Sequence, residues 1–325
     1  MWPRGLGVLR SGCLNVCLQT RWTHTNISIM SQPLVNASWL KAALSNGSRP
    51  DLRVIDVSFP MPGQKIDMQQ EYLKKHIAGA TFFSLGKVKD TESKYALMLP
   101  SPEVFADHVG KVHGVSNNTH VIVYDRNVKF GLFSACRLWW MFRVFGHDNV
   151  SVLDGGLEKW CSEDGATADG EMPTVEAGTF VPTYRENLVR GFADVAEGLA
   201  AKAFQVCDAR NAPRYNGEAP EPNPKLPSGH MKGATNVPFF NMLDPETKTL
   251  KSADAIKEVY ASFGIDLNKP TIMTCGSGVT ATVLAFTAFM AGQQSIPVFD
   301  GSWTEFVQRA TPEQVESLQF PLGEA

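Results

Sequence analysis

The stretch from Met273 to Ala281 places a reactive side chain among glycines, and it reads Met-Thr-Cys-Gly-Ser-Gly-Val-Thr-Ala. An apolar run that begins at Pro270 leads to Cys275, and an apolar helical pattern begins at Val279. This order predicts a strand, a tight loop and a helix, with a thiol in the loop. A cysteine at such a turn is typical of a nucleophile.

Backbone amides in this loop would stabilise a negatively charged sulfur. The first amides of a helix have no intrahelical acceptor and carry a partial positive charge, and glycines let neighbouring amides turn toward an anion. Such surroundings favour the thiolate over the thiol. The alternative, a small buried cysteine used only for packing, is disfavoured by the glycines beside it. We therefore expect Cys275 and Ser277 to be catalytic, and the other loop residues to contact the substrate: Gly276, Gly278, Val279 and Thr280.

Composition limits the class of protein. The chain has 325 residues, of which 43% are apolar, enough for two domains with cores of their own. Its formal net charge of -3 argues against a nucleic-acid surface. No apolar run approaches the ~18 to 20 residues of a membrane span. The cysteines lack the paired short spacings of a zinc site. We expect no metal, no cofactor, no nucleic acid and no membrane as a partner, and free thiols in a reducing compartment.

Residues 1–30 have the composition of a targeting segment. No acidic residue precedes Asp51, whereas Arg4, Arg10 and Arg21 lie among apolar residues. This pattern is typical of a mitochondrial transit peptide. We expect a leader at 1–30 and a location in the mitochondrial matrix. Translation from Met30 would instead give a cytoplasmic form.

The rest of the chain contains one pattern twice. The paired segments follow the same order: Arg53–Asp56 with Gln205–Asp208, His76–Thr81 with His230–Thr235, Ser101–Ala106 with Ser252–Lys257, Val121–Asp125 with Thr271–Cys275, and Val152–Gly156 with Val298–Ser302. Matches that keep one order indicate an internal duplication. Each half alternates short apolar strands with helical stretches. The fold class is therefore α/β, with two tandem domains, each a parallel sheet flanked by helices.

The predicted domains span residues 32–160 and 186–325, joined by a polar linker at 161–185. The carboxyl ends of parallel strands form the usual binding crevice, which places Cys275 where a ligand docks. The first domain has Asp125 at that position, so it keeps the fold without the nucleophile. We expect it to form a wall over the site. Its aromatic helix is expected to serve as core and interdomain packing through Trp139, Trp140, Phe142 and Phe145.

These features resemble the rhodanese superfamily. The tandem domains, the loop sequence from Cys275 and the Asp-Gly-Ser-Trp motif at Asp300–Trp303 are similar to those of its mercaptopyruvate sulfurtransferases, over roughly Gln32 to Pro312. The resemblance implies that the thiolate takes sulfur from 3-mercaptopyruvate, a small-molecule donor, and leaves pyruvate. The Cys275 persulfide would then pass its sulfur to thioredoxin, to a low-molecular-weight thiol such as glutathione, or to cyanide, with hydrogen sulfide released in some cases.

The charge of the loop bears on the choice of donor. In the thiosulfate-using relatives the two positions after the cysteine are cationic, whereas here they are Gly276 and Ser277. A neutral loop favours a donor with a single carboxylate. The Ser277 hydroxyl is expected to donate to the thiolate or to help move a proton to the departing enolate. The alternative is a hydroxyl that merely caps the loop.

The resemblance assigns the donor carboxylate to Arg214, whose planar guanidinium suits bidentate binding. The second arginine of the family falls at Asn223, so Lys225 is the expected substitute. Where the family has an aspartate and a histidine in its first domain, this chain has Gly86 and Leu97. The acid that protonates the enolate is therefore unassigned.

Other polar residues are expected to be structural. His76 and His230 occupy equivalent positions in the two halves, one of which has no nucleophile. Arg210 lies close to a strand end and should pair with a neighbouring acid. Strand-end bracing is expected of Asp56, Asp154, Asp208 and Asp300.

Three other functions stay open: a thiosulfate sulfurtransferase, a non-catalytic rhodanese-like binding module, and a cysteine phosphatase. The phosphatase reaction needs an arginine six positions after the cysteine to clamp the phosphate, and here that residue is Ala281.

Overall fold

The apolar runs that the sequence repeats form the central strands of two parallel sheets. The computed structural model describes residues 32–45, 49 and 51–319, which belong to one compact unit, Ser31–Ala325. The predicted leader and the second start at Met30 lie outside the described residues.

Among its described residues, the first half contains seven strands and five α-helices. The strands are β1 Leu34–Val35, β2 Leu52–Asp56, β3 His76–Ile77, β4 Thr81–Phe82, β5 His120–Tyr124, β6 Val150–Leu153 and β7 Thr167–Ala168. The helices are α1 Ala37–Ser45, α2 Met68–Lys74, α3 Pro102–His113, α4 Ala135–Val144 and α5 Gly156–Ser162.

The second half repeats this order of elements. Its strands are β8 Val189–Arg190, β9 Gln205–Asp208, β10 Ser228–Met231, β11 Thr235–Asn236, β12 Thr271–Thr274, β13 Val298–Phe299 and β14 Val315–Gln319. Its α-helices are α6 Phe192–Ala201, α7 Ala212–Tyr215, α8 Ala253–Ser262, α9 Val279–Met290 and α10 Ser302–Arg309. Short 3-10 helices lie at Glu186–Leu188, Phe239–Met242 and Pro312–Gln314.

The two sheets have the same topology. The first has the strand order β1-β6-β5-β2-β4 and the second β8-β13-β12-β9-β11, and every pairing in both is parallel. Each half also has a small antiparallel pair, β3 with β7 and β10 with β14. The predicted α/β fold and its duplication are confirmed.

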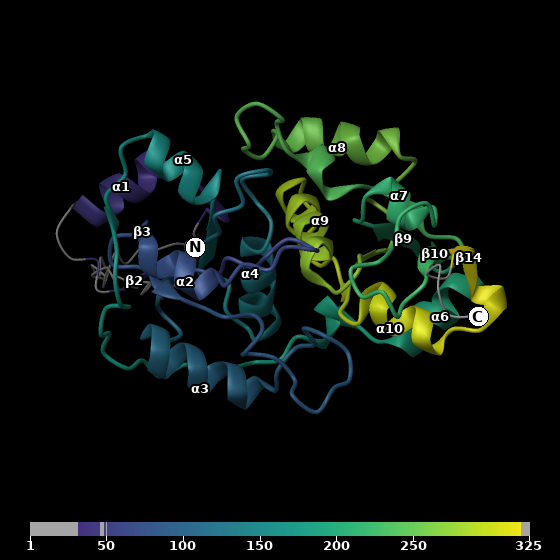
Figure 1. Cartoon of the computed structure of the whole chain (residues 1–325), viewed down its shortest axis with the longest axis horizontal. Helices are drawn as coiled ribbons and strands as arrows, with labels where there is room; N and C mark the ends of the chain where they lie inside the picture. Colours follow the sequence, from purple (N-terminus) through teal and green to yellow (C-terminus); the bar gives the residue numbers. More distant parts are fainter. Residues whose placement is uncertain (1–31, 46–48, 50, 320–325) are drawn as a thin grey trace, which may run out of the picture. The chain divides into compact units, whose positions relative to one another are not determined.

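Helices cover both faces of each sheet because alternate strand residues point to opposite sides. In β5, Ile122 and Tyr124 pack with α1 and α5, whereas Val121 and Val123 pack with α3 and α4. Figure 1 shows α1 and α5 at the top of the first half and α3 at its bottom. In the second half, α6 and α10 cover one face, and α8 and α9 cover the other.

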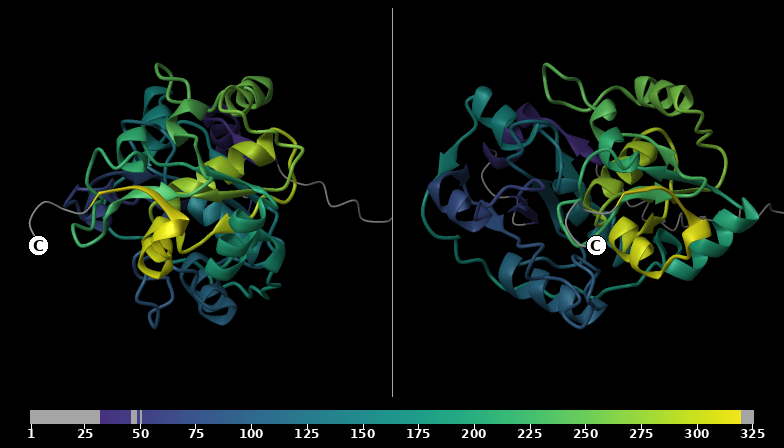
Figure 2. Two further views of the ribbon diagram at one scale, coloured as in Figure 1. Left: turned by 90° about the vertical axis from the view of Figure 1, so that its right-hand side faces the viewer. Right: turned by 45° about the vertical axis from the view of Figure 1, so that its right-hand side comes forward.

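One continuous core joins the halves through α4 and α9, which contact each other near the boundary between the halves (Figures 1 and 2). The Trp139 ring lies 4.8 Å from that of Phe286 and 5.4 Å from that of Phe289. Trp139, Trp140, Phe142 and Phe145 are all buried, which confirms their predicted packing role. Helix α9 is apolar on nearly every side because it lies between its own sheet and α4.

The segment predicted as a linker, residues 161–185, first completes the first half. It carries the end of α5 and strand β7 before its irregular part, 169–185. This irregular part lies along the first half: the Gly178 amide donates to the Gly110 carbonyl (2.9 Å), and the buried Phe180 ring lies 6.0 Å from that of Phe105.

The repeated histidines are structural, as predicted. His76 stacks on Tyr72 at 3.9 Å and His230 stacks on Tyr215 at 3.8 Å, and each ring Nδ1 hydrogen-bonds the carbonyl of its tyrosine. The two tyrosine hydroxyls donate to equivalent carbonyls, those of Ala80 and Ala234. These matched contacts fix the chain before β4 and before β11.

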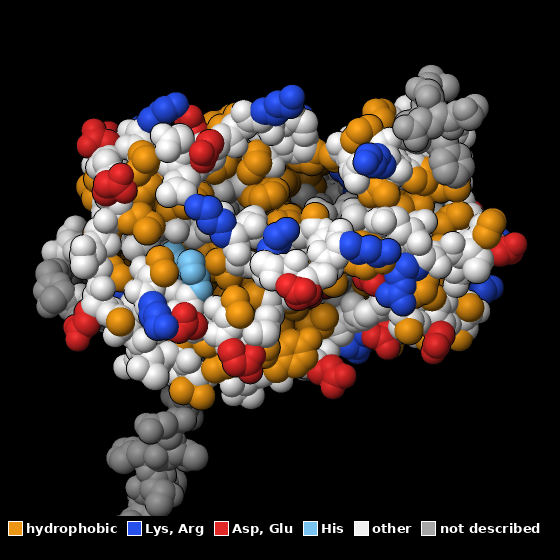
Figure 3. Space-filling view, turned by 60° about the horizontal axis from the view of Figure 1, so that its bottom comes forward, with side chains coloured by type: hydrophobic (Ala, Val, Ile, Leu, Met, Phe, Trp, Pro, Cys, Tyr) orange, Lys and Arg blue, Asp and Glu red, His pale blue; other side chains and the backbone are white. Residues whose placement is uncertain are grey.

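No helix among the described residues is long and apolar enough to cross a membrane. On the face of the molecule shown in Figure 3, basic and acidic side chains are both present and apolar ones lie among them.

Candidate active site

The cysteine loop joins β12 to α9 and is held from behind by the start of α10. The Cys275 amide donates to Ser302 Oγ (3.2 Å), and the Cys275 carbonyl accepts from the Trp303 amide (3.0 Å). The Gly276 carbonyl accepts from both the amide and the hydroxyl of Thr304 (3.0 and 2.7 Å). These bonds fix the loop backbone, and they give the Asp-Gly-Ser-Trp motif a physical role that its sequence did not reveal.

The loop leaves its own amides unused. Among the described residues, no acceptor takes the amides of Gly276, Ser277 or Gly278. Gly278 adopts a left-handed conformation (φ 80°) as the N-cap of α9, which favours glycine. Free amides at a helix start are the arrangement that binds anions, so the loop can hold a negative sulfur.

A cavity of about 340 Å³ lies over the loop and is lined by both halves. The second half contributes Arg214, Glu221, Pro222, Asn223, Leu226, Cys275, Gly276, Ser277, Val279, Thr280 and Thr304. The first half contributes Phe59, Pro60, Pro62, Lys89, Ala96, Leu97 and Phe133. The first half thus forms a wall over the nucleophile, as the sequence predicts. Cys275 is only 2% exposed because these walls enclose it.

Most of the predicted site residues meet in this cavity. Cys275, Ser277, Arg214, Gly276, Val279 and Thr280 all line it. Lys225 does not: its side chain is exposed. Gly278 lies outside the lining, and a Cβ there would meet the Asp300 carbonyl at 2.8 Å and Arg137 Nη1 at 2.9 Å. The role of Gly278 is therefore to allow close backbone approach.

Arg214 lies against the loop but is ion-paired. A Cβ on Gly276 would come within 2.6 Å of Arg214 Nη2, so a larger residue at this position would require the guanidinium to shift. Arg214 pairs through two nitrogens with Glu221, which is buried. Glu221 also accepts from Arg210 Nη1 (2.8 Å). Arg210 is buried and bonded to Asp208, which confirms its predicted structural role.

A buried ion pair beneath the loop joins the two halves. Arg137 of α4 lies 2.7 Å from Asp300, donates to the Leu97 carbonyl (2.6 Å) and reaches the Gly278 carbonyl (3.3 Å). Asp300 also accepts from the Leu99 amide (2.7 Å). The two ionic side chains are at most 4% exposed. Their contacts position the first-half wall relative to the cysteine loop.

Sequence reasoning missed several residues of the site. Lys89, Glu221, Phe133 and Thr304 line the cavity, and Arg137 supports it. Of the positions where the chain departs from the family, Leu97 and Asn223 line the cavity, whereas Gly86 is exposed and lies outside its lining. Glu221 could have been suspected from the sequence only because it lies seven residues after Arg214 and a buried arginine needs an acidic partner.

The other described cysteines have different surroundings. Burial raises the pKa of Cys136 and of Cys207, so both thiols stay protonated at neutral pH. Cys161 is partly exposed, at the end of α5. Among the described cysteines, Cys275 is the one that combines a helix start with a cavity.

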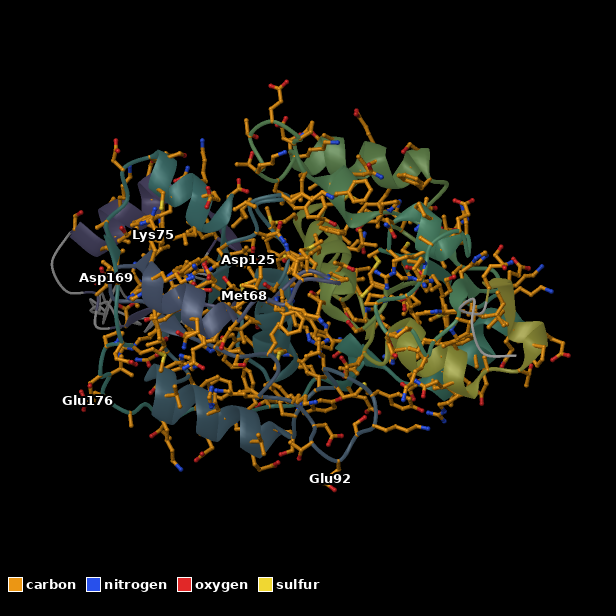
Figure 4. All side chains as sticks on the ribbon, viewed as in Figure 1. Met68, Lys75, Glu92, Asp125, Asp169 and Glu176 are labelled. Carbon is orange, nitrogen blue, oxygen red and sulfur yellow. The ribbon has the colours of Figure 1, made fainter. Side chains whose placement is uncertain are left out.

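The equivalent loop of the first half is filled by a carboxylate. Asp125 Oδ1 accepts from the Asn127 amide (3.0 Å), and Oδ2 accepts from the amides of Phe133 (2.9 Å) and Ala135 (2.8 Å). Burial raises the pKa of Asp125, and these amide donors oppose the rise. Asp125 and Met68 line a separate cavity of about 520 Å³ beside α2 (Figure 4).

The chain contains two sheets with the same strand order, and one of them carries a cysteine loop. Comparison with known protein families gives a matching result. The Rhodanese-like domain matches the chain twice, over residues 36–163 and 192–309. The chain belongs to the rhodanese family. It is a sulfurtransferase, as the names of its relatives also indicate.

Two rat relatives match the chain equally well. One is named thiosulfate sulfurtransferase and is 42% identical over 88% of this chain and 95% of its own length. The other is named 3-mercaptopyruvate sulfurtransferase and is 42% identical over 87% of this chain and 95% of its own length. The crystal structure of SseA from Escherichia coli, described as showing the fold and mechanism of 3-mercaptopyruvate sulfotransferases, is 35% identical with a TM-score of 0.75. The match covers 84% of this chain and 99% of that one.

Proposed function

We propose that this sulfurtransferase takes sulfur from 3-mercaptopyruvate and passes it to a thiol or to cyanide. The Cys275 thiolate attacks the donor sulfur, the carbon–sulfur bond breaks, and the electron pair leaves with the carbon as the enolate of pyruvate. A proton then converts the enolate to pyruvate. The sulfur stays on Cys275 as a persulfide. The acceptor attacks the terminal sulfur, the sulfur–sulfur bond breaks, and the Cys275 thiolate is regenerated.

The observation that carries the proposal is the neutral cysteine loop beside Arg214. Gly276 and Ser277 bring no cation to the sulfur, and both line the cavity with Cys275. Loop amides stabilise one negative charge on sulfur in the thiolate, and the same amides serve the persulfide anion. A donor with one carboxylate suits this site better than a dianion.

Ser277 is our candidate for handling the proton. Its side chain makes no hydrogen bond to another described residue, so the hydroxyl is available to a donor in the cavity. A hydroxyl close to the sulfur can donate to the leaving enolate. The loop-capping alternative has less support, because Ser277 Oγ bonds no loop amide.

A direct comparison of donors tests the proposal. We expect kcat/KM for 3-mercaptopyruvate to exceed that for thiosulfate by about tenfold or more, a difference of ~1.4 kcal/mol, with cyanide as the common acceptor. Ser277→Lys, which adds a cation beside the cysteine, should move the ratio toward thiosulfate, and Ser277→Ala is the matched control for loss of the hydroxyl. A wild-type preference for thiosulfate would overturn the assignment of the donor.

The alternative donor, thiosulfate, has one observation in its favour: a relative of that name is as similar to the chain as one named for 3-mercaptopyruvate. A non-catalytic binding module would consume neither donor. The phosphatase reading has no support in the site, because Ala281 is fully buried in α9 and no arginine occupies its position.

We further propose thioredoxin or a low-molecular-weight thiol as the physiological acceptor and the mitochondrial matrix as the location. The location rests on the acid-free, arginine-bearing residues 1–30. Imaging of a fluorescent fusion, with and without residues 1–29, would show whether the leader is needed. Transfer rates from the persulfide to thioredoxin and to glutathione would rank the acceptors.

A further inference from the structure

The cavity over Cys275 has two basic side chains in its lining, Arg214 and Lys89. The charge of Arg214 is already balanced. Arg214 and Arg210 face Glu221 and Asp208 in one connected cluster, so two guanidinium groups meet two carboxylates. This cluster can orient an incoming carboxylate through hydrogen bonds, but it contributes no net positive charge.

Lys89 differs from Arg214 because its charge is not balanced. Its side chain is half-buried, and among the described residues no carboxylate lies within ion-pair distance of its ammonium group. The acids of the same loop are used elsewhere or face away. Asp90 Oδ1 accepts the amides of Glu92 (2.9 Å) and Ser93 (3.3 Å), and the Glu92 side chain points outward from the end of the loop (Figure 4).

The surroundings of Lys89 strengthen its pull on an anion. Apolar side chains form much of the cavity wall, among them Phe59, Pro60, Pro62, Phe133 and Leu226. Charges attract more strongly beside low-dielectric walls than in open water. A half-buried ammonium without an acidic partner gains most from a ligand that brings one negative charge.

We propose that Lys89 binds the anionic group of the sulfur donor from the first half, opposite the Cys275 loop, and so sets the charge that the cavity accepts. This inference rests on the proposed function and extends it. The guanidinium cluster is neutral and no residue of the cysteine loop is cationic, so Lys89 is the one cation in the described cavity lining that has no carboxylate partner. One unpaired cation suits a donor with one carboxylate, and it places a specificity residue in the half that has no nucleophile.

Kinetics of three variants test the proposal. Lys89→Gln should lower kcat/KM for 3-mercaptopyruvate on the order of tenfold, mainly through KM, because a charge-assisted contact is lost in a partly screened cavity. Lys89→Arg should restore most of the loss. The matched control is Lys87→Gln: Lys87 lies two residues earlier in the same loop, bonds Gln69 Oε1 (3.1 Å), and is absent from the cavity lining.

A second measurement does not depend on turnover. Iodoacetate carries a carboxylate and iodoacetamide does not, yet both alkylate a thiolate by the same displacement of iodide. The rate ratio of iodoacetate to iodoacetamide at Cys275, followed by mass spectrometry of its peptide, should fall several-fold in Lys89→Gln and stay unchanged in Lys87→Gln. Raised salt should shrink the difference.

The outcomes separate the two proposals. If wild-type protein fails to use 3-mercaptopyruvate but the alkylation ratio still depends on Lys89, the proposed donor is wrong and the anion site stands. If wild type uses the donor and Lys89→Gln behaves like Lys87→Gln in both assays, the role of Lys89 is refuted.

Discussion

The loops after β5 and β12 occupy the same place in two sheets of identical order, yet they treat negative charge differently. In the first half the chain supplies its own anion, the Asp125 carboxylate, which accepts three loop and helix amides. In the second half Cys275 stands there, and the amides of Gly276, Ser277 and Gly278 have no acceptor among the described residues. The first arrangement is closed and the second is open to a ligand.

A second position shows the same contrast. Tyr72 and Tyr215 are equivalent because each stacks on the repeated histidine, so the residue before each tyrosine is also equivalent. That residue is Glu71 in the first half and Arg214 in the second, and each lines the cavity of its own half. One scaffold therefore carries acids at two positions in one copy, and a thiol and a cation in the other. The duplication kept the backbone and changed the charge.

Removing the nucleophile should have the largest effect. Cys275→Ser should lower sulfur transfer by about 10⁴-fold or more, because a hydroxyl neither ionises at neutral pH nor forms a persulfide. The free energy of unfolding should change by less than ~1 kcal/mol, since the side chains are nearly the same size. Steady-state rates and urea denaturation measure the two effects. Residual activity above a few per cent would mean that another thiol carries the sulfur.

Asp300 and Asp154 each accept a leucine amide from the other half, but replacing them with asparagine should change the unfolding free energy by different amounts. Asp300 accepts the Leu99 amide and Asp154 the equivalent Leu250 amide (2.7 and 2.8 Å), but Asp300 also faces the buried Arg137. Asp300→Asn leaves that guanidinium unpaired and should cost about 3 to 5 kcal/mol in unfolding free energy.

The control for this prediction is Asp154→Asn. Burial raises the pKa of Asp154 to about 6, above its ordinary value of 3.8, so the folded state prefers the protonated acid. Its stabilising contribution is present below pH ~3.8 and is lost as the pH rises through ~6. Asp154→Asn should therefore be neutral or mildly stabilising at pH 7. Urea titrations of both variants at pH 5 and pH 7 would test this, and equal losses at Asp154 and Asp300 would contradict it.

The contrast between Arg214 and Glu71 predicts a loss of donor binding. Arg214→Ala should lower kcat/KM for 3-mercaptopyruvate by ~30- to 1000-fold, corresponding to about 2 to 4 kcal/mol, because a charge-assisted contact disappears. The equivalent change in the first half, Glu71→Ala, should leave the rate unchanged. Unaltered donor kinetics in Arg214→Ala would remove this residue from the site.

Removing the Asp125 carboxylate from the loop after β5 should lower the free energy of unfolding without lowering the rate of sulfur transfer. Asp125→Ala leaves three amides without their carboxylate and should lower the unfolding free energy by about 2 to 3 kcal/mol, partly offset by relief of a buried charge. Sulfur transfer per folded molecule should be unchanged. The measurement is urea denaturation together with rates at low temperature, and a loss of activity in the folded variant would show that the first loop takes part in the reaction.

The last predicted effect, which is absent at neutral pH and grows as the pH falls, is a difference in acid stability between the halves. Burial lowers the pKa of His113 to about 3 and that of His120 to about 4, both in the first half. Each therefore stabilises the fold above pH ~6.5, and this contribution is lost by up to ~1.4 kcal/mol per pH unit as the pH falls toward the lowered values. Hydrogen exchange measured peptide by peptide at pH 7 and pH 5 should show the first half opening sooner, and His113→Gln should reduce that difference. Equal opening of both halves would contradict the assignment.

Most of the fold could be predicted from the sequence because its determinants are local. Strand and helix periods, and the helices that begin after Ser101 and Ser252 in the repeated segments, depend on neighbouring residues. The nucleophile could be predicted for the same reason, since its loop and helix adjoin it in the chain.

The residues with which the first half lines the site could not be predicted, because they depend on how α4 packs against α9. Lys89 and Leu97 reach the cavity from a loop far from Cys275 in the sequence, and Arg137 reaches Gly278 from the other half. Lys225 was placed near the substrate only because it follows Asn223, and its side chain is exposed instead. Contacts between residues so far apart in the sequence cannot be inferred from their spacing along the chain.

The central claim is that the open loop holds an added sulfur atom where the rest of the protein cannot. The direct test is mass spectrometry of the cysteine peptides after exposure of the purified protein to 3-mercaptopyruvate without an acceptor, with partly exposed Cys161 as the internal reference. The account predicts one added sulfur on the Cys275 peptide, none on the Cys161 peptide, and loss of the addition when a thiol acceptor is supplied. An unmodified Cys275, or sulfur spread equally over both peptides, would contradict it.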